Sequence, residues 1–233
     1  MASIVNIGYF DPYLISSDQF EVSFKQNHFV SKDNSLYTTF KEKYAGAFEE
    51  FKTFFSRLQH FPAFPFVDEG IETCVVNIFK QSIEQAPAEE GNSFVGQGTL
   101  QGLPYQNDFL KNLILNICEP LKFYSNKLHV SVKLHRRAIE KGNETELKGL
   151  KPHKDYDSDI IIMMKIEQKN ILGGRNQITN DSQTILIEDS IAVPGSFIYV
   201  NNEQLFHELT PMSLVDPSQS GNRDVMILEI KKA

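Results

Sequence analysis

Two histidines and an aspartate have the residue types and spacing of a metal site. His153 and Asp155 are two positions apart, shortly before the apolar run 160–164. Residues two apart in an extended strand point to the same side, so this imidazole and this carboxylate can face one metal ion. His207, which follows the strand-like segment 196–200, can supply a third ligand. Two histidines and one carboxylate on one face of an octahedron leave three positions open, as in non-heme Fe(II) centres that react with oxygen.

Arg223 is the candidate anchor for an anionic cosubstrate. It lies after His207, at the start of the apolar segment 225–230. A guanidinium there can hold the far carboxylate of a dicarboxylate by paired hydrogen bonds while the near end of the same molecule chelates the metal. The alternative is an ion pair of Arg223 with Asp224 or Glu229 at the surface, which the sequence leaves open.

Short strands in the second half of the chain must hold these residues. Residues 128–134 alternate between apolar and polar, which predicts a strand. Continuing the same count places Arg136 on the apolar face, where a guanidinium needs an anionic partner, so Arg136 is a candidate substrate contact. The alternative is a buried arginine paired with an acidic residue of a helix. His129 and His135 fall on the opposite face and are expected to point to the surface or to helices. Further strands are predicted at 160–166, 184–187, 196–200 and 225–230.

The first half of the chain has helical periodicity. Apolar residues spaced by three and four predict helices over 44–58, 71–83 and 109–121, the last capped by Asn107 or Asp108. Helices followed by many short strands predict an antiparallel barrel or sandwich that is braced by helices.

Loops and domain organisation follow from the same pass along the chain. Residues 89–104 and 140–152 are rich in polar residues and predict loops. We expect one domain over residues 1–233, with helical support in 1–125 and the sheet core with its metal site in 126–233.

Composition limits the classes of partner. Lys and Arg total 23 against 30 for Asp and Glu, a net charge of −7 without a basic cluster, so we expect no nucleic-acid partner. The apolar runs are far shorter than the about 20 residues that cross a bilayer, and the first residues lack the layout of a signal peptide. We therefore expect no membrane association and a cytoplasmic location. Cys74 and Cys118 lie among apolar neighbours and are expected to be reduced core thiols.

Five separated blocks give the sequence a resemblance to a known family. They are VSVKLHRR at 130–137, PHKD at 152–155, NILGG at 170–174, FHELTP at 206–211 and GNRD at 221–224. In this order they resemble the bacterial 2-oxoglutarate/Fe(II) dioxygenases that include L-isoleucine 4-hydroxylase, over roughly the C-terminal half of the chain. The resemblance implies a mostly β fold with helices, in which a double-stranded β-helix, or jelly roll, is braced by the N-terminal helices.

The resemblance also implies roles for residues and cofactors. It makes His153, Asp155 and His207 the ligands of Fe(II), and Arg223 the anchor of the distal carboxylate of 2-oxoglutarate, with O2 as the other cosubstrate. The implied reaction hydroxylates an unactivated C–H bond of a free L-amino acid and decarboxylates 2-oxoglutarate to succinate. The sequence departs from the family where Tyr156 stands in place of a usual glycine. Tyr156 is therefore a candidate substrate contact, and the alternative is a packed tyrosine with its hydroxyl in water.

Three other functions stay open on the sequence. The same chemistry could act on a peptide side chain or another small metabolite. A jelly-roll module could bind a small molecule without catalysis. A zinc hydrolase could use the same three ligands with a water in the fourth place, although Arg223 would then have no role and no general base is evident nearby.

Overall fold

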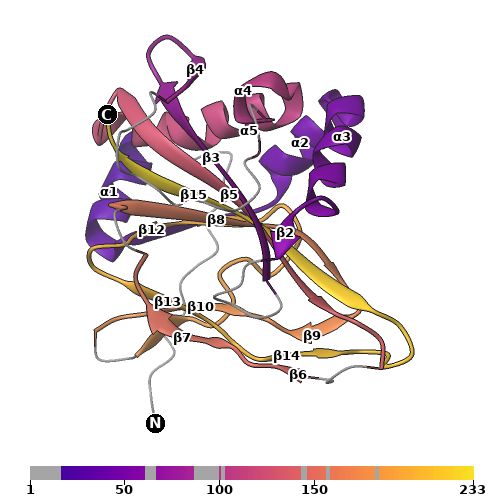
Figure 1. Cartoon of the computed structure of the whole chain (residues 1–233). Coiled ribbons are helices and arrows are strands. Elements are labelled where there is room, and N and C mark those ends of the chain that lie inside the picture. Colours follow the sequence, from indigo (N-terminus) through magenta and orange to yellow (C-terminus); the bar gives the residue numbers. More distant parts are fainter. Residues whose placement is uncertain are drawn as a thin grey trace.

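The chain folds into three layers in the computed structural model, which describes residues 17–60, 67–86, 100, 103–142, 146–155, 158–181 and 184–233. Helices cover one face of a large sheet, and two small sheets lie across its other face (Figure 1). The helical elements are α1 (Ser17–Asn27), α2 (Ser35–Lys43), α3 (Ala45–Phe55), α4 (Leu103–Gln106), α5 (Asp108–Cys118) and the 3-10 helix η1 (Glu119–Phe123).

The large sheet is antiparallel throughout. Its strands are β1 (Phe29–Lys32), β2 (Gln59–His60), β3 (Val67–Asn77), β4 (Ser82–Gln85), β5 (Lys127–Ile139), β8 (Ile160–Lys169), β12 (Phe197–Asn201) and β15 (Gly221–Lys232). They follow the order β1-β12-β8-β15-β5-β3-β2, and β4 also pairs with β3. The long strands β5 and β15 are neighbours at its centre.

The two small sheets complete the sandwich. One contains β7 (Leu150–His153), β10 (Asn176–Thr179), β11 (Ile185–Ile187) and β13 (Phe206–Leu209), in the order β11-β10-β13-β7. The other contains β6 (Glu146–Leu147), β9 (Ile171–Gly173) and β14 (Met212–Leu214), in the order β6-β14-β9. Antiparallel layers with helices on one side confirm the predicted fold class, a jelly roll braced by N-terminal helices.

One apolar cluster joins the helices to the outer face of the large sheet. Phe51 and Phe55 of α3 and Leu113 of α5 are buried in this cluster. Alternate residues of β5 enter it from the sheet: Leu128, Val130, Val132 and Leu134. The free thiols Cys74 and Cys118 also lie in it, which agrees with the expectation of reduced core cysteines.

Two of the three predicted helices are present, and the third is wrong. The patterns over 44–58 and 109–121 correspond to α3 and α5, and Oδ1 of Asn107 accepts a hydrogen bond from the Leu110 N–H at 3.0 Å as the expected cap. The pattern over 71–83 is strand β3 and the turn to β4. It is rich in β-branched residues, and short apolar runs do not distinguish a helix from a strand that is buried on both faces.

The predicted strands are all present, and the predicted loops agree only in part. The strands expected from 128, 160, 184, 196 and 225 correspond to β5, β8, β11, β12 and β15. Most of the loop expected over 89–104 lies outside the described residues, and its end forms the start of α4. The loop expected over 140–152 contains β6 and most of β7.

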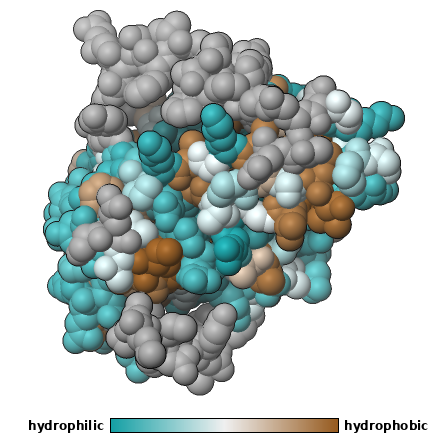
Figure 2. Space-filling view, turned by 90° about the horizontal axis from the view of Figure 1, so that it is seen from below, coloured by the Kyte–Doolittle hydropathy of each residue, from teal (hydrophilic) through white to brown (hydrophobic). Residues whose placement is uncertain are grey.

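The inner face of the large sheet, which faces the small sheets, is apolar on one side. Ile161 and Met163 of β8 and Ile198 of β12 pack there with Ile178 of β10 in a second apolar cluster. Charged residues of β3, β5 and β15 lie on the same face and are described below, while Val225 of β15 belongs to the second apolar cluster and Ile227 packs against it. Seen from the side of the small sheets, the surface is mainly hydrophilic with separate apolar patches (Figure 2). Among the described helices, none has the length and hydropathy of a membrane span.

Candidate active site

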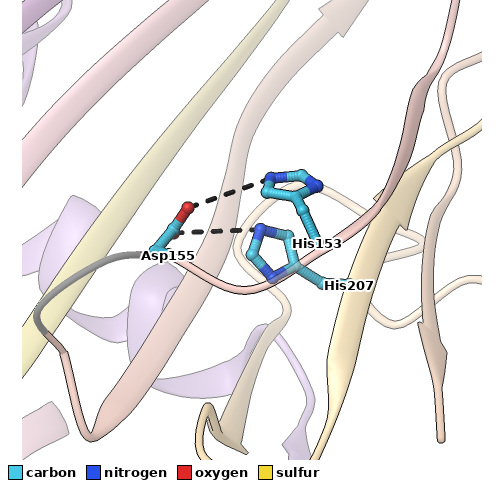
Figure 3. A group of neighbouring side chains, drawn as sticks. All are labelled: His153, Asp155 and His207. Carbon is cyan, nitrogen blue, oxygen red and sulfur yellow. Dashed lines mark ion pairs between the residues drawn. The ribbon is translucent and has the colours of Figure 1, made fainter. Parts of the chain in front are cut away.

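Three potential metal ligands converge where β7 and β13 pair. His153 of β7 and His207 of β13 are direct cross-strand partners, and their ring centroids are 4.2 Å apart. Asp155 follows β7, and its carboxylate oxygens lie 3.8 Å from Nε2 of His153 and 3.8 Å from Nε2 of His207 (Figure 3). One ligand atom from each of the three residues lies within 4.8 Å of the others, a group that could hold a metal ion.

The main chain around Asp155 is held by the buried amide of Asn202, which is only 3% exposed. The Asp155 N–H donates to Oδ1 of Asn202 at 3.2 Å, and Nδ2 of Asn202 donates to the Asp155 carbonyl at 2.7 Å. The same Nδ2 donates to the carbonyl of Ser158 at 2.9 Å. Because Asp155 lies beyond the end of β7, these hydrogen bonds, and not the pleat of a strand, fix the carboxylate opposite the imidazoles.

The surroundings of both imidazoles leave a ring nitrogen able to bind a metal. Nδ1 of His153 lies 2.7 Å from the carbonyl of Lys151. A carbonyl only accepts, so Nδ1 carries the proton there and Nε2 is free to bind a metal. Burial lowers the pKa of His207 to about 4, although the Asp155 carboxylate opposes this effect. His207 is therefore neutral at pH 7, the state in which imidazole ligates a metal.

This donor set fits ferrous iron with its cosubstrates. Two neutral nitrogens and one carboxylate oxygen suit a 2-His-1-carboxylate centre, which leaves coordination positions open. The three residues come from β7, the loop after it and β13, so two paired strands and one hydrogen-bonded loop set the geometry.

Arg223 lies inside the fold and is 4% exposed. Its Nη2 donates to Oδ1 of Asn176 on β10, and its Nε has no hydrogen-bond partner among the described residues. The surface ion pair that the sequence left open is wrong, because Asp224 pairs with Arg136 and Glu229 pairs with Lys133. Burial lowers the pKa of Arg223 to about 10, so the guanidinium remains charged at neutral pH.

The inner face of β3, β5 and β15 forms a charged wall, defined by Glu69, Lys133, His135 and Glu229. Lys133 pairs with Glu229, and Nε2 of His135 contacts Glu69. The Glu229 carboxyl group also contacts Asp155, so the wall borders the three possible metal ligands, His153, Asp155 and His207, which we call the metal-ligand group. Burial raises the pKa of Glu229 to about 7, while Lys133 opposes the shift. The side chains of Lys133 and His135 are 23% and 29% exposed, whereas the inner residues of β8 are buried.

Arg136 lies on the other face of β5. Its Nε and Nη2 donate to the two carboxylate oxygens of Asp224 at 2.8 and 2.7 Å, and its guanidinium lies over the ring of Phe55 in the helical layer. The apolar face of β5 is therefore the helix side, and Arg136 has the paired arrangement that was the alternative, with the acidic partner on β15 instead of a helix. His135, expected at the surface or against the helices and not as a metal ligand, is 29% exposed, contacts Glu69 on the inner face and lies outside the group of possible metal ligands.

Several residues of the site were not found from the sequence. Lys133, His135 and Arg137 alternate with the apolar stripe of β5, and that alternation was the signal that could have located them. Asn202 directly follows a buried strand, which is a weaker signal. Tyr156, a candidate substrate contact, lies outside the described residues.

The fold and site together define a jelly-roll oxygenase, and comparison with known proteins gives its family. The profile of the family described as 2OG-Fe dioxygenase matches residues 100–229, more than half of the chain. The chain therefore belongs to the 2OG-Fe dioxygenase family. It is a dioxygenase whose cofactors are Fe(II), 2-oxoglutarate and O2. No curated protein sequence matches the chain.

Solved structures support the fold at low sequence identity. IDO from Bacillus thuringiensis is 14% identical with a TM-score of 0.72, over 93% of this chain and 99% of that one. A BsmA homologue from Methylobium petroleophilum PM1 is 13% identical with a TM-score of 0.72, over 98% of this chain and 96% of that one. The Fe(II)/α-ketoglutarate-dependent dioxygenase TqaL is 11% identical with a TM-score of 0.67, over 93% of this chain and 87% of that one. Such similarity shows a shared fold and does not assign a substrate.

Proposed function

We propose that this dioxygenase hydroxylates an unactivated C–H bond of a free L-amino acid, with His153, Asp155 and His207 as the iron ligands and Arg223 as the anchor of 2-oxoglutarate. When bound, iron with its cosubstrates supplies the oxidation, in which 2-oxoglutarate, O2 and the substrate C–H bond become succinate, CO2 and an alcohol. The observation that carries the proposal is the convergence of two imidazoles and a carboxylate beside a charged inner wall.

The protein's own residues position and shield the reactants. His153 is oriented by its hydrogen bond to the Lys151 carbonyl, and Asp155 by Asn202. The second apolar cluster, on β8 and β12, keeps water out of one side of the interior. Arg223 presents a guanidinium with a free Nε to the distal carboxylate of the cosubstrate.

The charged wall supports a free amino acid as the substrate class. A zwitterion needs a cation for its carboxylate and an anion for its ammonium group, and the wall offers the ammonium group of Lys133 and the carboxylate of Glu69, with the His135 ring and the Glu229 carboxyl group as further hydrogen-bonding partners. These partners satisfy one another without a ligand, and the side chains of Lys133 and His135 are each more than a fifth exposed. Arg136 is already paired with Asp224, so we leave it out of the substrate site.

The test combines a cosubstrate assay with an amino-acid panel. Purified protein with Fe(II) and 2-oxoglutarate should form succinate faster in the presence of an aliphatic L-amino acid. His153→Ala and Asp155→Ala should abolish turnover while the circular dichroism spectrum is kept. Lys133→Met should weaken amino-acid stimulation, and Lys127→Met, on the exposed end of the same strand, is the matched control.

Each result has a distinct meaning. Succinate formation that no amino acid stimulates, together with hydroxylated peptides in mass spectra of treated cell extracts, would reject the free amino acid and favour a peptide side chain. Equal stimulation of Lys133→Met and Lys127→Met would remove the charged wall from the substrate site. The single-domain organisation and the cytoplasmic location stay predictions from the sequence.

A further inference from the structure

Two buried arginines face each other on the central strands of the large sheet. Arg223 of β15 and Arg137 of β5 are direct partners in the antiparallel register. Both point away from the helices, and they are only 4% and 8% exposed. Side chains of directly opposed residues on neighbouring strands lie about 5 Å apart at their Cβ atoms, so the two guanidinium groups can reach one ligand atom.

Much of their hydrogen-bonding capacity is unused. Nη2 of Arg137 donates to the Lys148 carbonyl at 3.0 Å, and Nη2 of Arg223 donates to the Asn176 side chain. Nε and Nη1 of Arg137 and Nε of Arg223 are buried without a hydrogen-bond partner among the described residues. No ion pair joins a described carboxylate to Arg137 or Arg223: Asp224 is held by Arg136, and Asp189, whose charge raises the pKa of Arg223, does not form an ion pair with it.

Such a pair is costly without an anion. Buried charges in proteins are normally paired, because removing a cation from water is energetically costly. Two like charges side by side add mutual repulsion, and burial lowers the pKa of both guanidinium groups. One carboxylate accepts up to four hydrogen bonds, so it could satisfy donors from both arginines.

We propose that Arg137 is a second anchor, which holds the distal carboxylate of 2-oxoglutarate together with Arg223. This inference rests on the proposed function, because it takes Arg223 as the first anchor. Arg137 is a positioning residue: it sets the affinity for the cosubstrate's far end and leaves chelation by the keto end to the metal. The competing role is structural, in which Arg137 only ties β5 to the chain before β7 through the Lys148 carbonyl.

A pair of ligands separates these two roles. 2-Oxopentanoate has the same five-carbon chain and the same chelating end as 2-oxoglutarate, but lacks the distal carboxylate. Each is titrated anaerobically into the Fe(II) protein, and binding is followed by the visible charge-transfer band. Arg137→Met should weaken 2-oxoglutarate binding by about 10- to 100-fold, the loss expected for a charged hydrogen bond. Binding of 2-oxopentanoate should change less than twofold.

Controls make every outcome decisive. Arg57→Met removes an exposed guanidinium on the helical side and should change neither ligand. Equal affinities of wild type and Arg137→Met for 2-oxoglutarate, or equal losses for both ligands, would overturn the second anchor while the proposed function stands. A wild type that gives no band with either ligand would reject the proposed function instead. If Arg137→Met does not fold, Arg137→Lys serves, and it should weaken 2-oxoglutarate selectively by several-fold because one ammonium replaces the guanidinium fork.

Discussion

Replacing Asn202 with alanine tests whether a side chain outside the metal-ligand group controls the metal site. The change removes the acceptor of the Asp155 N–H and the donor to the carbonyls of Asp155 and Ser158. Each net hydrogen bond is worth about 1 kcal/mol, so three of them amount to about 3 kcal/mol of the free energy of unfolding. Little water can compensate, because Asn202 is 3% exposed.

The larger effect should be on metal affinity. Asp155 lies outside any strand, so without Asn202 its carboxylate loses the constraint that holds it opposite His153 and His207. Loss of an outer-shell partner of a metal ligand typically lowers affinity 10- to 100-fold. We expect a loss of this size for Fe(II), measured anaerobically by titration calorimetry well below the melting temperature of the variant.

The neighbouring residue provides the control. Among the described residues, Oδ1 of Asn201 accepts only the Glu203 N–H, at 3.1 Å, so Asn201→Ala removes one local hydrogen bond and should keep metal affinity. Urea unfolding of both variants separates stability from binding. A folded Asn202→Ala variant with the metal affinity of the wild type would refute the reasoning, because Asp155 would then be positioned correctly in the absence of the Asn202 side chain.

Three further predictions follow from buried groups. Arg136→Met should cost about 3 kcal/mol of unfolding free energy in urea because it leaves Asp224 buried and unpaired, and Asp224→Leu in the same chain should recover most of this loss; additive losses would contradict the ion pair. Gly174→Ala should weaken 2-oxoglutarate binding about tenfold, since its Cβ would lie 2.7 Å from Sδ of Met212 and 3.0 Å from Cδ of Arg223, whereas Gly142→Ala, also at positive φ but in open space, should not. In metal-free protein, unfolded His207 takes up a proton near pH 6.5 and folded His207 only near pH 4, so the folded state should lose up to about 3 kcal/mol of unfolding free energy as the pH falls from 6.5 to 4. The melting temperature of His207→Gln should therefore depend less steeply on pH than that of the wild type. Equal pH dependence of the two melting temperatures would contradict the lowered pKa of His207.

The convergence of His153, Asp155 and His207 could be predicted from the sequence, but for a partly different physical reason. Strand alternation led to a shared direction for His153 and Asp155, and the two side chains do face one another. The structure ends β7 at His153, so alternation cannot position the aspartate. Asn202 positions Asp155 although the two residues are far apart in sequence, and no local sequence pattern predicts such a contact.

The misassigned segment shows the limit of periodicity. In β3 the apolar residues on the outer face pack against the helices, and Val75 on the inner face is also buried, so the pattern lacks a clear period of two. Cross-strand pairing with β5 decides the structure of this segment, and that pairing joins positions that are far apart in sequence. Propensity, with Thr73 and two adjacent valines, was the better guide at this point.

The position of the chemistry on β5 depends on which layer covers its apolar stripe. The alternation of apolar and polar residues defines two faces of β5 but does not say which layer covers each face. Taking the apolar face as the interior of the jelly roll made Arg136 a candidate substrate contact. In this chain the helical half supplies the larger apolar core, so Leu134 and its alternates point to the helices. The polar alternates Lys133, His135 and Arg137 then lie on the inner face, on the side of Asp155 and the two histidines. When the apolar face of a strand packs against a layer of helices, the binding residues of that strand are therefore expected on its polar face.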